Sequence, residues 1–310
     1  MKIILAQPRG FCAGVTRAIE TVERALKKFG PPIYVRHEIV HNKFVVDSLK
    51  DKGVIFVDEV DQVPEGSLVI FSAHGVSDKV EEDATAKNLE IIDATCPLVS
   101  KVHREAKKYE EEDYEIILIG HKGHPEVEGT SGRVKKSVEL VTNEDDARNI
   151  KISDNAKLAY VTQTTLSVDD TKSIVDILED RFPNMKKGLA TKDICYATQN
   201  RQDAVRELSK EVDMILVIGS KNSSNSNRLC DLAIECNVES YLINDEAQIE
   251  NKWLLGKKNI GITAGASAPE ILVERVVAKI KEISRDDVQV EIMKGKIENT
   301  QFALPRKVRK

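Results

Sequence analysis

Three cysteines, Cys12, Cys96 and Cys195, each end a short apolar run and open a helical pattern. A helix N-terminus favours the thiolate, which is the form of cysteine that binds metals. Three such thiolates without a local Cys-x-x-Cys pair match structural zinc poorly, because that site usually takes four ligands. They match better a 4Fe-4S cluster in which one iron has no protein ligand and could activate a substrate oxygen. The pattern therefore favours an iron–sulfur centre.

Packing is the alternative explanation for any single cysteine, because free cysteine is among the residue types most often buried. Cys230 and Cys236 lie within one helical pattern and fit that explanation. The other three differ because their surroundings repeat along the chain. A helical pattern, a short apolar strand and a polar loop follow each of them in the same order. The repetition favours a shared ligand over packing for these three.

The polar loops lie at nearly constant distances from the cysteines. The first loop of each repeat is reached after 28 to 30 residues, an agreement too close for chance. A second polar loop, again at the end of an apolar strand, lies 62, 68 or 72 residues beyond its cysteine. The first loops carry His41, His124 with Glu126, and Ser223, Ser224 and Asn225; the second loops carry His74, Thr164 with Thr165, and Ser267.

Helical patterns that alternate with short apolar strands predict an α/β fold with mainly parallel sheets. Such sheets bind ligands beyond the carboxyl ends of their strands, where every polar loop above is expected. We therefore predict three α/β units related by a pseudo-threefold axis, with their loop ends facing a common centre. The expected boundaries are 1–96, 97–193 and 194–282, followed by a basic closing tail at 283–310.

The loops offer imidazole, hydroxyl and amide groups, one carboxylate and few cations. Several charge-assisted hydrogen bonds, each contributing roughly 1.5 to 3 kcal/mol, could hold a pyrophosphate there without an arginine clamp. Glu126 would be out of place beside a phosphate. It is better interpreted as a proton donor, because a dry, anion-rich site raises the pKa of a carboxyl. Each loop taken alone would be interpreted as an ordinary capped turn. The equivalent positions of the loops in the three repeats are the reason to predict a binding site.

Composition narrows the partners and the compartment. Hydrophobic residues at 41%, charged residues at 31% and a formal charge of −5 argue against disorder and against a general nucleic-acid binder. The first apolar run has four residues, too short for a signal-peptide core, and no later run approaches a membrane span. We expect a cytoplasmic protein with no nucleic-acid or membrane partner. Disulfides are not expected in that reducing compartment.

Seven segments, in order, resemble those of the 4-hydroxy-3-methylbut-2-enyl diphosphate reductase family. The resemblance runs from the first expected strand to about residue 280. The segments are PRGFCAGV (8–15), FSAHGV (71–76), DATCPLV (93–99), GHKGHPEVEG (120–129), TQTTLS (162–167), GSKNSSNSNR (219–228) and TAGASAP (263–269).

The resemblance implies a trefoil of three α/β domains around a central 4Fe-4S cluster. It implies the last step of the non-mevalonate isoprenoid pathway, reductive removal of an allylic hydroxyl to give isopentenyl and dimethylallyl diphosphate. Because two electrons must arrive singly, it also implies a ferredoxin or flavodoxin donor with its reductase.

The resemblance also assigns roles to individual residues. Cys12, Cys96 and Cys195 become the cluster ligands, and the substrate hydroxyl would bind the open iron. Thr164 would contact that hydroxyl and Glu126 would supply protons. The diphosphate would be held by His41, His74, Ser223, Ser224, Asn225 and Ser267, with His124 close by and Thr165 beside Thr164. The resemblance assigns no functional role to Cys230 or Cys236.

Two other functions stay open at this point. One is a dehydratase similar to quinolinate synthase, which uses an open iron as a Lewis acid and needs no external electrons. The other is a non-catalytic iron–sulfur redox sensor, which would leave the hydroxyl-rich loops unexplained.

Overall fold

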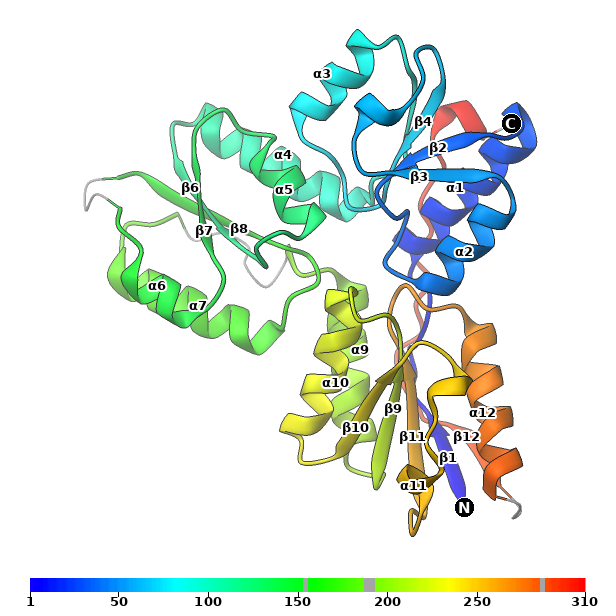
Figure 1. The fold of residues 1–310 in the computed structure, drawn as a ribbon. Helices are drawn as coiled ribbons and strands as arrows, with labels where there is room; N and C mark the ends of the chain where they lie inside the picture. Colours follow the sequence, from blue (N-terminus) through cyan, green and yellow to red (C-terminus); the bar gives the residue numbers. More distant parts are fainter. Residues whose placement is uncertain (153–155, 187–192, 285–287, 310) are drawn as a thin grey trace. The chain divides into compact units, whose positions relative to one another are not determined.

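Short apolar runs form the strands of three sheets in the computed structural model, which describes residues 1–152, 156–186, 193–284 and 288–309 (Figure 1). Every strand pair among these residues is parallel. Helices alternate with the strands along the chain, as parallel pairing requires. The predicted α/β class, with three mainly parallel sheets, is therefore confirmed.

The chain divides into two compact units, each built from separate stretches. The first holds the five-stranded sheet and the second holds the other two sheets. Helices α1 (Ala13–Phe29) and α2 (Lys43–Asp51) begin in the first unit and continue into the second. The first unit comprises Met1–Thr16, Val40–Ser48 and Tyr196–Gln301; the second comprises Arg17–Ile39, Leu49–Cys195 and Phe302–Lys310.

The sheet of the first unit is buried on both faces. Leu216, in the inner strand Met214–Ile218, packs in a cluster with apolar residues of the helix on one face. Its neighbours Ile215 and Val217 pack with the two helices on the other face. The strand order is β10 (Glu239–Ile243), β9 (Met214–Ile218), β11 (Asn259–Ala264), β1 (Lys2–Leu5) and β12 (Gln289–Ile292). The helices are α12 (Glu270–Ser284) on the first face and α9 (Tyr196–Leu208) with α10 (Ser224–Glu235) on the second, while α11 (Asn251–Leu254) precedes β11.

Strand β1 joins the sheet of the third predicted unit rather than that of the first. Ile3 aligns with Ile260 of β11 on one side and with Val290 of β12 on the other. Its side chain is fully buried in the cluster that α12 covers. Order along the chain does not fix which sheet a strand enters, so the sequence did not reveal this exchange. We keep the division at 1–96, 97–193 and 194–282 as a proposal, except that the opening strand β1 belongs to the sheet of the third predicted unit.

The second unit contains two smaller sheets. The three-stranded sheet is covered on one face by α4 and α5 and on the other by α6 and α7. The four-stranded order is β3 (Val54–Val57), β2 (Ile33–Arg36), β4 (Leu68–Phe71) and β5 (Glu90–Asp93); the three-stranded order is β7 (Val138–Val141), β6 (Glu115–Ile119) and β8 (Leu158–Thr162). The helices are α3 (Asp78–Ala86), α4 (Pro97–Glu111), α5 (Pro125–Ser131), α6 (Glu144–Asn149) and α7 (Val168–Arg181).

Several helices begin where a polar side chain satisfies a free backbone N–H. Ser77, Asn143 and Ser167 accept such bonds at the starts of α3, α6 and α7. Short 3-10 turns at Val60–Gln62, Glu246–Gln248 and Arg306–Val308 complete the described elements. None of the described helices has both the length and the hydrophobicity needed to cross a bilayer.

An inner strand of the first unit, β9, is the basis of a stability prediction. Leu216→Ala should lower the free energy of unfolding of the apo-protein by about 2 to 5 kcal/mol, because it leaves a cavity at a fully buried position. The matched control is Leu255→Ala, which changes a side chain that is 76% exposed. Thermal and urea unfolding measure the difference. Equal midpoints for the two variants would contradict the placement of β9 at the core.

Candidate functional site

Each of the three predicted cysteine ligands lies at the start of a helix. Cys96 caps α4, and Pro97 follows in the first turn, where its missing N–H is not needed. Cys12 directly precedes α1, and its carbonyl accepts the N–H of Thr16 in the first turn. Cys195 directly precedes α9. All three are partly exposed, and none of the five cysteines forms a disulfide.

A backbone hydrogen bond fastens each of these cysteines to a polar loop. In each case the cysteine N–H donates to a carbonyl in the loop after a neighbouring strand, β11, β4 or β8. The bonds are Cys12 to Ala266 at 3.2 Å, Cys96 to Ala73 at 2.9 Å and Cys195 to Thr164 at 3.0 Å. Each cysteine is thus held to the second polar loop of another repeat. This is the preceding repeat for Cys96 and Cys195 and the third repeat for Cys12. The sequence analysis grouped each cysteine with the loops that follow it, because chain order was its only guide.

Thiols are the ligand type that an iron–sulfur cluster takes. Among the described residues, no three His, Cys, Asp or Glu side chains are gathered as a metal site. The remaining two cysteines have other surroundings. Burial raises the pKa of the Cys230 thiol, which also contacts Ser240, and Cys236 ends α10. The ligand role of Cys12, Cys96 and Cys195 stays a prediction, and Cys230 and Cys236 differ from them in their surroundings.

In the first unit, three of the predicted diphosphate loops meet through hydrogen bonds. The Ser267 hydroxyl donates to the His41 carbonyl at 2.9 Å, and the Lys43 N–H donates to the Ser220 hydroxyl at 3.1 Å. Asn222 Nδ2 lies 3.4 Å from His41 Nδ1. The loops after β9 and β11 and the segment at His41 are therefore joined in one unit.

Asn225 is the clearest sign of a missing ligand in this unit. Its side chain lies in the first turn of α10 and is only 4% exposed. Neither its Oδ1 nor its Nδ2 finds a hydrogen-bond partner among the described residues. Leaving a buried polar group unsatisfied costs about 1 to 3 kcal/mol, so native proteins rarely keep two on one side chain. The amide is therefore placed to bind something that the chain itself does not supply.

Ser226 is a neighbour that the sequence analysis did not single out. Its hydroxyl donates to the Ser223 hydroxyl at 3.0 Å and is fully buried. A Cβ added at Gly219 would lie 2.2 Å from this hydroxyl, and one at Gly265 would lie 2.1 Å away. Both glycines are thus required for the loops to close on Ser226. In the sequence, the glycine after β9 and the glycine in the loop after β11 are the features from which this close packing around Ser226 could have been predicted.

In the second unit, Glu126 is buried in the first turn of α5 and is 2% exposed. Its carboxylate accepts the Thr164 N–H at 2.6 Å and the Thr164 hydroxyl at 3.0 Å. Burial raises the pKa of Glu126 to about 7, although the two bonds from Thr164 act in the opposite direction. A carboxyl with this pKa can both give and take a proton at neutral pH.

Two imidazoles lie beside this carboxyl. His124 caps α5, and its Nδ1 accepts the Glu126 N–H at 3.1 Å, so the proton of the neutral ring lies on Nε2. The ring centroids of His74 and His124 lie 5.8 Å apart, edge to face. The second unit therefore gathers four of the predicted residues, His74, His124, Glu126 and Thr164.

Thr165 has a supporting contact in the structure. Its hydroxyl accepts a hydrogen bond from Gln163 Nε2 at 2.8 Å, while Gln163 Oε1 accepts the His121 N–H at 3.0 Å. Thr165 thus helps to join the loop after β8 to the loop after β6. Gln163 is fully buried and was missed in the sequence because a single amide in a polar loop carries no pattern.

Asp193 is a second buried carboxyl, to which the sequence analysis gave no role. It is 3% exposed and lies 3.4 Å from Lys101 Nζ, and it accepts the Thr162 N–H at 3.4 Å. Burial raises its pKa, and Glu105 adds to the shift while Lys101 opposes it. Asp193 in turn contributes to the raised pKa of Glu126.

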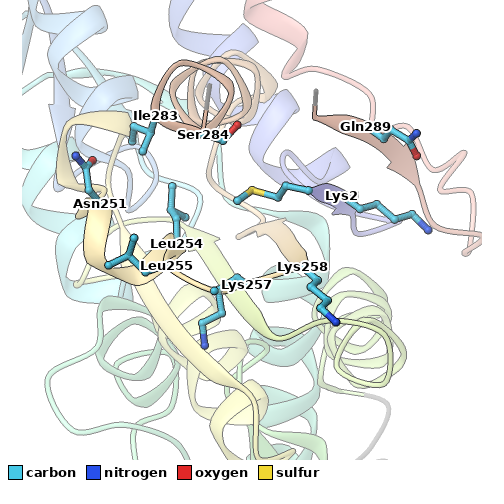
Figure 2. A pocket seen from close by; sticks show the side chains of 11 residues that line it. Lys2, Asn251, Leu254, Leu255, Lys257, Lys258, Ile283, Ser284 and Gln289 are labelled. Atoms are coloured by element: carbon cyan, nitrogen blue, oxygen red, sulfur yellow. The ribbon is translucent and has the colours of Figure 1, made fainter. Parts of the chain in front are cut away.

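A cavity of about 740 Å³ lies elsewhere in the first unit, at the amino ends of its strands (Figure 2). Lys2, Lys258 and Gln289 line it beside Leu254. None of the predicted site residues lines this cavity. Parallel sheets bind ligands at their carboxyl ends, so the cavity does not alter the assignment of the polar loops.

Parallel sheets, thiols at helix starts and a buried carboxyl with a raised pKa are typical of an α/β enzyme. Comparison with known proteins narrows this class. The family model described as LytB protein matches residues 3–281, and the chain belongs to that family.

The relatives and solved structures that match are named as one kind of reductase. The 4-hydroxy-3-methylbut-2-enyl diphosphate reductase of Dechloromonas aromatica (strain RCB) is 57% identical over 306 residues, which cover 99% of each chain. A solved structure of the E-1-hydroxy-2-methyl-but-2-enyl-4-diphosphate reductase from Plasmodium falciparum is 40% identical, with a TM-score of 0.94 over 99% of this chain and 96% of that one.

A second solved structure, of (E)-4-hydroxy-3-methyl-but-2-enyl diphosphate reductase, is described as that of the terminal enzyme of the non-mevalonate pathway. It is 36% identical, with a TM-score of 0.65 over 91% of this chain and 99% of that one. The family, the fold class and the reductase class predicted from the motifs are therefore confirmed.

The pKa of Glu126 predicts a pH-dependent stability. Its folded-state pKa of about 7 lies above the ordinary value of 4.5, so the folded protein keeps a proton that the unfolded chain loses. Stability should fall as pH rises from 4.5 to 7 and stay lowered above that window, by up to about 3 kcal/mol.

Glu126→Gln removes this ionisation and should therefore unfold at a higher temperature than wild type above pH 7, with the gap closing towards pH 4.5. Thermal unfolding of the apo-protein across this pH range measures the effect. A gap that does not change with pH would show that Glu126 is not the shifted group.

Proposed function

We propose that this chain reduces 4-hydroxy-3-methylbut-2-enyl diphosphate to isopentenyl and dimethylallyl diphosphate, the last step of the non-mevalonate pathway. The names of the relatives support the substrate, and the buried Glu126–Thr164 pair is the observation that carries the chemistry. The reaction replaces an allylic hydroxyl by hydrogen. It consumes two electrons and two protons and releases one water, so it needs a proton donor at two moments.

Glu126 is the group that meets this need. A carboxyl with a pKa of about 7 is substantially protonated at neutral pH, so it can protonate a departing hydroxyl. The same group, reprotonated, can then deliver a proton to the allyl carbon. Thr164 bonds to both carboxyl oxygens, so its hydroxyl is placed to bind the substrate hydroxyl and orient it towards Glu126.

The diphosphate is assigned to neutral and imidazole donors. Asn225 offers an amide with no partner among the described residues, and Ser223, Ser224 and Ser267 offer hydroxyls in the loops joined to it. The first turn of α10 adds backbone N–H groups and the positive end of a helix dipole. The imidazoles assigned to the same anion are His41, His74 and His124.

Cys12, Cys96 and Cys195 would hold a 4Fe-4S cluster, since each is a thiol placed where a helix dipole favours the thiolate. When bound, the cluster supplies electrons one at a time and an iron that acts as a Lewis acid. A one-electron carrier such as ferredoxin or flavodoxin, with its reductase, is the donor that this chemistry requires.

Membership of the LytB family favours reduction over the quinolinate-synthase-like dehydration. A redox sensor has no need for a carboxyl with a pKa near neutrality or for an orphaned amide, so the site favours an enzyme.

The acid assignment predicts the effect of Glu126→Gln. The variant should keep its iron and bind the diphosphate, but turnover should fall by about a hundredfold to ten-thousandfold, because general acid–base catalysis is lost. Glu128→Gln is the matched control, since Glu128 lies on the same helix and is exposed. Anaerobic turnover with a one-electron reductant is the measurement. Undiminished reduction by Glu126→Gln would remove Glu126 as the acid.

The diphosphate assignment predicts the effect of Asn225→Ala. Affinity for the substrate should fall by about tenfold to a hundredfold, the loss expected for one or two hydrogen bonds to a charged group. The iron content should not change, because Asn225 is not a ligand. Asn251→Ala, an exposed amide on α11, is the control. Calorimetric titration with the substrate under anaerobic conditions measures affinity, and equal dissociation constants would contradict the assignment.

A further inference from the structure

The C-terminal segment 293–309 lies beyond the residues matched by the family model. Most of it is exposed, and residues 293–305 form no helix or strand. Such a segment would ordinarily be a loose tail, as the sequence analysis expected. Two of its residues instead contact arginines that hold the loops before Cys12 and Cys96.

The first contact lies in the first unit, at Arg201. This side chain on α9 is fully buried, which is rare for arginine unless it is paired. Its Nε and Nη2 both donate to the Gly10 carbonyl, at 3.1 and 2.7 Å. Its Nη1 and Nη2 lie 3.2 Å from the carboxylate of Glu298, and Asn200 Nδ2 holds that carboxylate at 2.9 Å.

Gly10 is the residue through which this contact reaches Cys12. Its φ of +67° lies in the left-handed region, and its N–H donates to the Ala264 carbonyl at 3.0 Å. The peptide between Gly10 and Phe11 is thus held by Arg201 on its carbonyl side. Two residues later, the Cys12 N–H is held by Ala266. Arg201 therefore fixes the turn that aims Cys12.

The second contact lies in the second unit, at Arg17 on α1. Its Nη1 donates to the Thr95 carbonyl at 3.0 Å, and its Nη2 lies 3.4 Å from the Asp93 carbonyl. Its Nε donates to the Ala303 carbonyl in the C-terminal segment at 2.9 Å. Arg17 therefore grips the peptide that immediately precedes Cys96.

Electrostatics agree with this geometry. Burial lowers the pKa of Arg17, whereas the nearby Asp93 and Cys96 raise it. The coulombic effect of Cys96 on Arg17 places that residue near the guanidinium, which agrees with the hydrogen bond to the Thr95 carbonyl. The segment after Ala303 is itself anchored, because Lys28 donates to the Lys307 carbonyl at 2.7 Å and Val308 is buried.

We propose that Arg201 and Arg17 are positioning residues for Cys12 and Cys96, and that the C-terminal segment completes both anchors through Glu298 and the Ala303 carbonyl. This rests on the proposed function, which makes these cysteines cluster ligands. Partners that orient metal ligands without touching the metal usually change metal affinity by about tenfold to a hundredfold when they are lost. An arginine is suited to the task because its planar fork can bind several carbonyls at once.

The test compares four variants with wild type after anaerobic reconstitution with iron and sulfide. Arg17→Gln and Arg201→Gln each remove one anchor. Lys27→Gln on α1 and Arg206→Gln on α9 are the matched controls; Lys27 is exposed, and Arg206 pairs with Asp203 on the same helix. The measurements are the rate of cluster loss to an iron chelator, the KM for the diphosphate and the unfolding temperature of the apo-protein.

Both anchor variants should lose their cluster about tenfold faster than wild type or more, while KM changes less than about twofold and the controls match wild type. Because Arg201 is fully buried, Arg201→Gln is judged together with Glu298→Gln, which keeps an acceptor for Arg201 but removes its counter-charge. Glu298→Gln should also speed cluster loss without lowering the iron first incorporated.

Arg17→Lys separates positioning from charge. Lysine keeps the cation, but its single nitrogen cannot reach three carbonyls that contact three different nitrogens of Arg17, so cluster loss should remain faster than in wild type. Full rescue by Arg17→Lys, or equal rates of cluster loss in wild type and both anchor variants, would overturn the proposal. A wild-type protein that takes up no cluster would instead overturn the cysteine assignment on which the proposal depends.

Discussion

Three backbone hydrogen bonds determine how the candidate site is built. Each runs from the N–H of a predicted cysteine ligand to a carbonyl in the loop after a neighbouring parallel strand. Parallel pairing brings the carboxyl ends of neighbouring strands to one edge, so a thiol and a set of polar side chains arrive together. The helix that each cysteine opens then supplies the field that favours the thiolate. The same backbone hydrogen bond thus positions a candidate ligand and the polar side chains around it.

Burial is the largest cause of the raised pKa of Glu126, the proposed proton donor. Glu126 is removed from solvent by the packing of α5 against β6 and β8. Thr164 opposes the shift but does not cancel it. The same threonine carbonyl holds the Cys195 N–H, so the proton donor and one cysteine share a single anchoring residue. A change in that loop should therefore affect both the acid and the ligand.

Much of this could be predicted from the sequence because it depends on local patterns. The recurrence of cysteine, helix, strand and polar loop predicted an α/β fold with mainly parallel sheets, which the structure has. The single carboxylate in the polar loops led to the proposal that Glu126 is the acid. The pairing of β1 with β11 was not predictable, since a short apolar run can enter any sheet. It brings Cys12 to the loop after β11, at the far end of the chain, a relation that chain order conceals.

Contacts between distant residues were also beyond the sequence. Arg201 and Glu298 are 97 positions apart, and each looks like an ordinary surface charge in its own helix or tail. In the sequence, Asn225 is one of several polar residues in its loop. Its burial without a hydrogen-bond partner among the described residues distinguishes it from them. Side chains that matter because of what surrounds them become visible only once the fold is known.

The central claim is that Cys12, Cys96 and Cys195 together hold one iron–sulfur cluster. The most direct measurement is the iron and sulfide content of anaerobically prepared protein, for wild type and for Cys96→Ser, with Cys236→Ser as the control. The account predicts about four iron and four sulfide per chain in wild type and in the control, and loss of most of both in Cys96→Ser. A colourless wild-type protein containing stoichiometric zinc would contradict it.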